Sequence, residues 1–242
     1  MVTEVIKKPA LIPAIPVSGK TPFSHAHITI LEGAQGSGKT GTAVARVIDA
    51  YDLDCMAIYC RENLGIKCEV KSYARRQRVA KIKYNGKKKL IRIPSSYKLC
   101  SALQIHANFH FYGVPFYYYK NFGSILAGLR SGKIRDGYLV VDEYYIGGNA
   151  REGQKQLAKQ LVKQSFQYRK KQLEVIYITP MARLIDWTAR MLPTEHIQCS
   201  YNEKTRKITL SIRKKGQQGT KEISYDASRY WPNYWTNETI NE

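Results

Sequence analysis

The sequence predicts an α/β fold, a three-layer sandwich built around a mainly parallel central sheet. Two observations predict it: short apolar runs alternate with segments of helical periodicity, and a polar or charged residue ends each run or follows it directly. The runs are residues 27–31 (HITIL), 138–141 (YLVV) and 174–179 (EVIYIT). Ligands of such sheets bind at the carboxyl ends of the strands, so we expect the functional site there.

A glycine-rich loop follows the first apolar run and precedes a predicted helix. Residues 33–40 read GAQGSGKT, which completes the strand, glycine loop and helix of a P-loop. In such a loop backbone N–H groups surround phosphate oxygens, the lysine reaches the β and γ phosphates, and the hydroxyl coordinates Mg²⁺. The sequence therefore predicts ATP and Mg²⁺ as cofactors, bound by Gly33, Ala34, Gln35, Gly36, Ser37, Gly38, Lys39, Thr40 and Gly41.

Two acidic residues follow the run 138–141. A nucleotide-hydrolysing site needs a carboxylate near the metal, commonly at the end of a buried strand. We expect Asp142 to hold Mg²⁺ together with Thr40, and Glu143 to polarise the attacking water as the general base. The acidic pair favours hydrolysis over transfer to a small acceptor. Thr179, which ends the run 174–179, lies where a sensor of the γ-phosphate would.

The charge of the chain is strongly positive and unevenly distributed. The 242 residues include 39 Lys and Arg against 19 Asp and Glu, a net charge of +20 that favours a polyanionic partner. Residues 70–135 contain no acid, and Asn85-Gly86 between alternating runs predicts a hairpin with Lys81 and Lys83 on one face. A solvated face is the alternative interpretation. The predicted DNA contacts are Arg75, Arg76, Arg78, Lys81, Lys83, Lys87, Lys88 and Lys89.

The chain is interpreted as a tail or strap over residues 1–24 and one ATPase domain over residues 25–242. Basic hairpins are expected at about 66–95 and 201–226, a short strand at 55–60 and a helix at about 153–171. Residues 99–119 are as long as a membrane span but contain several polar residues, so we expect a buried strand with an aromatic loop and no membrane partner. The seven Phe and Tyr residues in 109–119 are expected mainly to fill the core, with a base-stacking platform as the alternative.

These motifs, with the blocks 166–190 (FQYRKKQLEVIYITPMARLIDWTAR) and 230–239 (YWPNYWTNET), resemble the FtsK/HerA-type genome-packaging ATPases of archaeal viruses and the zonular-occludens-toxin-like proteins of filamentous phages. The resemblance covers about residues 27–238 and implies a RecA/ASCE-like P-loop NTPase fold, with the strand of Thr179 between the P-loop strand and the Asp142 strand. Met181 departs from the pattern, because such ATPases often have Gln there.

The same resemblance implies a homo-oligomeric ring that translocates double-stranded DNA into a capsid. Its partners would be DNA and a capsid protein, and it would act in the host cytoplasm and associate with the virion. Ring ATPases complete the site with an arginine from the neighbouring subunit, for which Arg151 and Arg169 lead over Arg183 and Arg190. A small P-loop nucleotide kinase and a non-motor DNA-binding assembly ATPase are the alternative functions.

Overall fold

The computed structural model describes residues 28–74, 77–94, 103–112, 114–142, 160, 163–168, 170–185 and 190–226. They fall into two compact units. The smaller unit holds the described residues of Ile48–Leu103, and the larger one holds those of Phe23–Val47 and Gln104–Glu242. The predicted tail over residues 1–24 lies outside the described residues.

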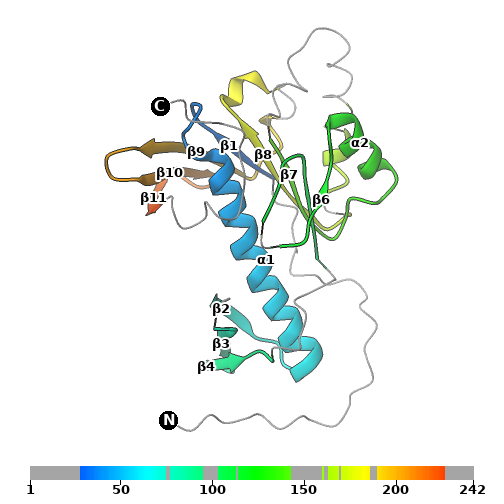
Figure 1. The fold of residues 1–242 in the computed structure, drawn as a ribbon, viewed down its shortest axis with the longest axis vertical. Helices are drawn as coiled ribbons and strands as arrows, with labels where there is room; N and C mark the ends of the chain where they lie inside the picture. Colours follow the sequence, from blue (N-terminus) through cyan, green and yellow to red (C-terminus); the bar gives the residue numbers. More distant parts are fainter. Residues whose placement is uncertain are drawn as a thin grey trace. The chain divides into compact units, whose positions relative to one another are not determined.

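The larger unit is built on an eight-stranded sheet with the order β11-β10-β9-β1-β8-β7-β5-β6 (Figure 1). Neighbouring strands from β9 to β6 in this order are parallel, whereas β9, β10 and β11 form an antiparallel meander. This arrangement confirms the predicted α/β fold with a mainly parallel sheet. The strands are β1 Ile28–Glu32, β5 Gln104–Ala107, β6 Tyr117–Tyr118, β7 Gly137–Val141, β8 Leu173–Thr179, β9 Glu195–Asn202, β10 Lys207–Lys214 and β11 Lys221–Asp226.

Strand β8 lies between β1 and β7, as the resemblance implied. In the register of these parallel pairs, Glu32 lies opposite Thr179 and Val141 lies opposite Tyr177. The P-loop begins directly after Glu32, and Asp142 follows Val141. Because parallel strands present their carboxyl ends at one edge, the P-loop, Thr179 and Asp142 meet at the same edge of the sheet.

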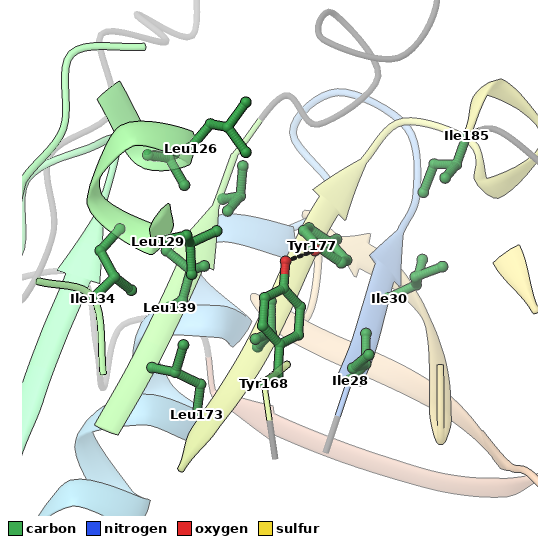
Figure 2. Packing of buried hydrophobic residues seen from close by; sticks show 13 residues of the cluster. Ile28, Ile30, Leu126, Leu129, Ile134, Leu139, Tyr168, Leu173, Tyr177 and Ile185 are labelled. Atoms are coloured by element: carbon green, nitrogen blue, oxygen red, sulfur yellow. Dashed lines mark hydrogen bonds between the residues drawn. The ribbon is translucent and has the colours of Figure 1, made fainter. Parts of the chain in front are cut away.

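One face of the central strands packs against helix α2, Phe122–Arg130. Alternate strand residues such as Ile30, Leu139 and Tyr177 point to this face, and α2 adds Leu126 and Leu129 (Figure 2). Tyr168 is fully buried here and its hydroxyl lies 2.7 Å from the Tyr177 hydroxyl, while burial raises the pKa of Tyr168 to about 12. The two hydroxyl groups therefore form a hydrogen bond with each other inside an otherwise apolar cluster.

Helix α1, Lys39–Leu64, is the longest element, and it corrects one expectation. Residues 55–60 (CMAIYC), expected as a strand, belong to this helix. Their apolar run is too short to distinguish strand from buried helix, and no glycine or proline interrupts the chain between Gly41, in the first turn of the helix, and Gly65. The helix ends at Gly65, which has φ +65°, and Ile66 N donates to Cys60 O at 3.0 Å.

The smaller unit contains a three-stranded antiparallel sheet in the order β2-β3-β4, with β2 Glu69–Ala74, β3 Val79–Tyr84 and β4 Lys87–Arg92. Asn85 and Gly86 join β3 to β4 with φ values of +48° and +75°. Two successive positive φ values are typical of a tight hairpin turn that matches the strand twist. The predicted first hairpin is therefore confirmed.

The second predicted hairpin is also present, as β10 and β11. It is not a free ribbon, because β10 pairs along its length with β9 and so extends the central sheet. Within the described ranges, no helix combines the length and the apolar character needed to cross a lipid bilayer.

A candidate nucleotide site at the carboxyl edge of the sheet

The P-loop turns tightly between β1 and α1, and two glycines allow it. A Cβ on Gly33 would lie 2.4 Å from Ser37 Oγ and 2.5 Å from Cys199 O. A Cβ on Gly38, whose φ is +83°, would lie 2.5 Å from Ile208 Cδ1. Side chains at these positions would force the loop open, so the glycines permit the close main-chain turn that a phosphate-binding loop requires.

The residues with predicted metal roles are in contact. Thr40 Oγ1 donates to Asp142 Oδ2 at 2.8 Å. A hydroxyl and a carboxylate are hard oxygen donors of the kind that Mg²⁺ takes beside phosphate oxygens. Lys39 Nζ donates to Ala34 O at 2.7 Å, which keeps its ammonium over the loop.

The loop also contains an orphaned polar atom. Ser37 Oγ is buried and has no hydrogen-bond partner among the described residues. A buried hydroxyl without a partner costs free energy, which an acceptor such as a phosphate oxygen would offset. The glycine turn, this hydroxyl and the Thr40–Asp142 oxygen pair therefore fit the phosphates of ATP and an Mg²⁺ ion.

Asn108 holds the main chain of Asp142 at both of its polar groups. Asn108 Oδ1 accepts from Asp142 N at 2.7 Å, and Asn108 Nδ2 donates to Asp142 O at 2.9 Å. The sequence interpretation did not select this residue. A signal existed, because Asn108 follows the buried strand β5 just as Asp142 follows β7, and these two strands are neighbours.

Thr179 is fully buried, and its hydroxyl donates to Met181 O at 3.0 Å. Two hydrogen bonds join the turn that follows it to the end of β1 and the start of the P-loop: the side-chain Oε2 of Glu32 accepts from Ala182 N at 2.7 Å, and Gly33 N donates to Pro180 O at 3.3 Å. The turn after β8 thus forms one wall of the P-loop. The sensor role of Thr179 stays a prediction.

The C-terminal meander supports the other side of the P-loop. Thr42 Oγ1 donates to Gly38 O at 2.8 Å and lies 2.8 Å from the Tyr225 hydroxyl of β11. Cys199 of β9 lies beside Thr42, and burial raises the pKa of its thiol to about 11. Cys199 is therefore a neutral packing residue at neutral pH, and Tyr225 is a contact that the sequence interpretation missed.

The predicted DNA-binding lysines divide between the two faces of the basic sheet. Lys81 and Lys83 are exposed, and the register places Lys88 opposite Lys83. Arg92 lies opposite Val79 on the same face. This set, the basic face, therefore consists of Lys81, Lys83, Lys88 and Arg92.

Lys87 and Lys89 belong to the opposite face, where Ala80, Ile82 and Ile91 are buried. Lys89 Nζ lies 6.0 Å from the centre of the Tyr84 ring. Arg78 donates to Pro94 O at 2.8 Å at the base of the hairpin. The hairpin therefore presents only part of its predicted basic set on one surface.

Five of the predicted site residues lie outside the described residues. They are Glu143, Arg75, Arg76, Arg151 and Arg169.

No family model and no curated protein matches the chain. Among solved structures it is similar to the N-terminal domain of zonular occludens toxin from Neisseria meningitidis, with 15% identity and a TM-score of 0.52 over 87% of this chain and 99% of that one. A KaiC-like protein from Pyrococcus horikoshii OT3 has 12% identity and a TM-score of 0.43, covering 83% and 85%. The DNA-packaging ATPase of Sulfolobus turreted icosahedral virus has 10% identity and a TM-score of 0.42, covering 81% and 96%. At these identities the likeness concerns the fold alone, and the zonular occludens toxin domain agrees with the mainly parallel α/β fold of this chain.

Proposed function

We propose that this protein is a Mg²⁺-dependent ATPase that translocates double-stranded DNA and packages a viral genome into a capsid. The observation that carries the ATPase part is the 2.8 Å bond between Thr40 and Asp142 beside the glycine turn. This pairing of a P-loop hydroxyl with a strand-end carboxylate is what nucleotide hydrolysis with Mg²⁺ requires.

The reaction would be an in-line attack of water on the γ-phosphate of ATP. Bound Mg²⁺ neutralises charge on the phosphate oxygens. Lys39 and the P-loop N–H groups would stabilise the remaining negative charge, and Thr40 and Asp142 would hold the metal. Glu143 would orient the water and accept its proton. Asn108 would keep the Asp142 main chain in place while the metal binds.

The proposal for DNA depends on charge. The basic face presents Lys81, Lys83, Lys88 and Arg92 on one surface, although Glu69 lies opposite Lys83 and forms an ion pair with Lys71. Because counterions leave the phosphate backbone when such groups bind it, DNA affinity should fall steeply with salt. Arg151 or Arg169 of a neighbouring subunit would complete each site in a homo-oligomeric ring. This ring would bind a capsid protein, and it would act in the host cytoplasm and associate with the virion.

The test is steady-state ATP hydrolysis with and without double-stranded DNA, over a range of protein concentrations at fixed salt. We expect DNA to stimulate turnover, and the stimulation to rise cooperatively with protein concentration. Glu143→Gln should bind ATP without turnover, and Lys39→Ala should lose ATP binding. A Glu143→Gln variant that turns over like the wild type would remove the base assignment.

Other outcomes would redirect the assignment. Hydrolysis that ignores both DNA and protein concentration would overturn the motor and favour the assembly ATPase. Phosphoryl transfer to a nucleoside monophosphate, measured in the same assay by product analysis, would favour the kinase.

A further inference from the structure

The segment after β5 carries aromatic rings on the surface of the larger unit. Tyr117 and Tyr118 of β6 are 55% and 50% exposed, and His110 is exposed as well. The rings of His110 and Tyr118 stack with centres 4.8 Å apart and planes 10° apart. The expectation that these aromatics mainly fill the core therefore holds for the inner ring of Phe111, which is 2% exposed, and not for this outer layer.

The outer rings are held from behind. Tyr117 lies on the other face of β6 from Tyr118 and stacks on the buried His106, with ring centres 5.3 Å apart. Phe116 meets His110 edge-on at 5.8 Å. The main chain is fixed too, because β6 pairs with β5. Rings that are ordered before a ligand arrives lose little conformational entropy when they bind it.

The charge around these rings favours an anionic ligand. The stretch 103–135 contains no acidic residue and four basic ones, among them the exposed Lys120 two residues after Tyr118. An exposed aromatic face next to cations attracts a polyanion that also offers flat apolar surfaces. Unpaired nucleic-acid bases have these surfaces, whereas the bases inside a duplex are covered by stacking on each other.

We infer that His110 and Tyr118 form a base-stacking platform for a single-stranded stretch of nucleic acid. The inference builds on the proposed function, because it assumes that DNA is the partner, and it adds which chemical feature of the strand is recognised. Stacking accepts every base, so the platform would bind without sequence preference. Its contribution would come on top of the salt-dependent attraction between lysines and phosphates.

The experiment compares two strands that carry equal charge. Fluorescence anisotropy measures binding of an oligodeoxythymidine of about twenty nucleotides and of an abasic strand of the same length, in EDTA so that no ATP is hydrolysed. We expect wild-type protein to bind the base-bearing strand about tenfold more tightly. The variant Tyr118→Leu should lose this preference and bind the abasic strand like the wild type.

Two controls separate stacking from loss of structure. Tyr118→Phe keeps the ring and should keep the preference, and Phe166→Leu removes another aromatic, 64% exposed, which precedes β8 and should change nothing. Equal wild-type affinity for the two strands, or a preference that survives in Tyr118→Leu, would overturn the platform.

Further outcomes distinguish this inference from the proposed function. Wild-type protein that binds duplex DNA and is stimulated by it, yet shows no preference for bases, would overturn the platform alone. Protein that hydrolyses ATP but binds neither strand nor duplex would overturn the DNA partner and the platform together. If sedimentation shows that the leucine variant changes self-association and leaves DNA affinity intact, the rings form a contact between copies and the inference is wrong.

Discussion

The Thr40 hydroxyl donates to the Asp142 carboxylate at 2.8 Å, although 102 positions separate the two residues in the chain. Strand β8 lies between the strands that these residues follow, so the contact reaches across one strand of the sheet. It is possible because all three strands are parallel and end at one edge. The contact between these two proposed Mg²⁺ ligands is therefore a product of strand order.

This pair should control how Mg²⁺ affects nucleotide binding. We expect Thr40→Val and Asp142→Asn each to abolish the gain in ATP affinity that Mg²⁺ brings, because each removes one of the two oxygens that would hold the ion. Titration of a fluorescent ATP analogue with and without Mg²⁺ measures the gain. The control variant Thr209→Val makes the same substitution on β10 and should keep the gain in ATP affinity that Mg²⁺ brings. An intact Mg²⁺ effect in both site variants would place the metal elsewhere.

Asn108 should matter for both stability and turnover. Asn108→Ala removes both hydrogen bonds that Asn108 makes to the Asp142 main chain, so we expect a loss of about 2 kcal/mol in the free energy of unfolding. We also expect turnover to fall about tenfold, because the metal-holding aspartate gains freedom. Urea unfolding and ATPase assays measure the two effects.

The control for Asn108 is another asparagine with a purely structural contact. Asn121 caps helix α2 by accepting from Ser124 N at 2.9 Å. Asn121→Ala should cost about 1 kcal/mol of stability with turnover unchanged. Equal effects of the two variants on turnover would show that Asn108 acts through stability alone.

The two faces of the basic sheet should differ in their contribution to DNA binding. Replacing Lys81, Lys83, Lys88 and Arg92 with Gln should flatten the slope of log DNA affinity against log salt concentration. The change in slope should correspond to the loss of about four phosphate contacts. Replacing Lys87 and Lys89 should reduce the slope less, because these residues lie on the opposite face. Anisotropy titrations at several salt concentrations measure the slopes. A larger effect of the Lys87 and Lys89 pair would reverse the assignment of the binding face.

His106 should make the fold sensitive to acid. Burial lowers its pKa from 6.5 to about 4. The unfolded chain therefore binds the proton more readily than the folded chain, and stability, complete above pH 6.5, is lost as the pH falls towards 4. The shift corresponds to about 3 kcal/mol.

Urea unfolding at a series of pH values between these limits measures the effect. His106→Gln cannot take up a proton, so we expect a flatter pH dependence of its free energy of unfolding between pH 6.5 and 4. The Tyr119 hydroxyl lies 3.3 Å from His106 Nδ1, and the amide can replace that contact. A variant with the same acid sensitivity as the wild type would show that other groups cause it.

How far the sequence predicted this molecule depended on how local each signal was. The P-loop was predictable because strand, glycine turn, lysine and threonine are consecutive, and glycine is needed wherever a Cβ would meet Ser37, Cys199 or Ile208. The Asn85-Gly86 hairpin was predictable for the same reason. The prediction of a strand at residues 55–60 was wrong, because six consecutive apolar residues show neither strand nor helix periodicity. They belong to a helix that extends from Lys39 to Leu64, and its pattern becomes visible only over that length.

The P-loop, the strand-end acid Asp142, the basic hairpin and the parallel α/β architecture could be predicted from the amino-acid sequence, because each depends on neighbouring residues or on a repeated pattern. Three features became visible only in the folded chain: Asn108 holds the Asp142 main chain, Tyr225 contacts Thr42, and the Tyr117 and Tyr118 rings face solvent. These contacts join strands that are distant in the chain. Their partners are selected by sheet order and register, which the alternation of apolar residues does not encode.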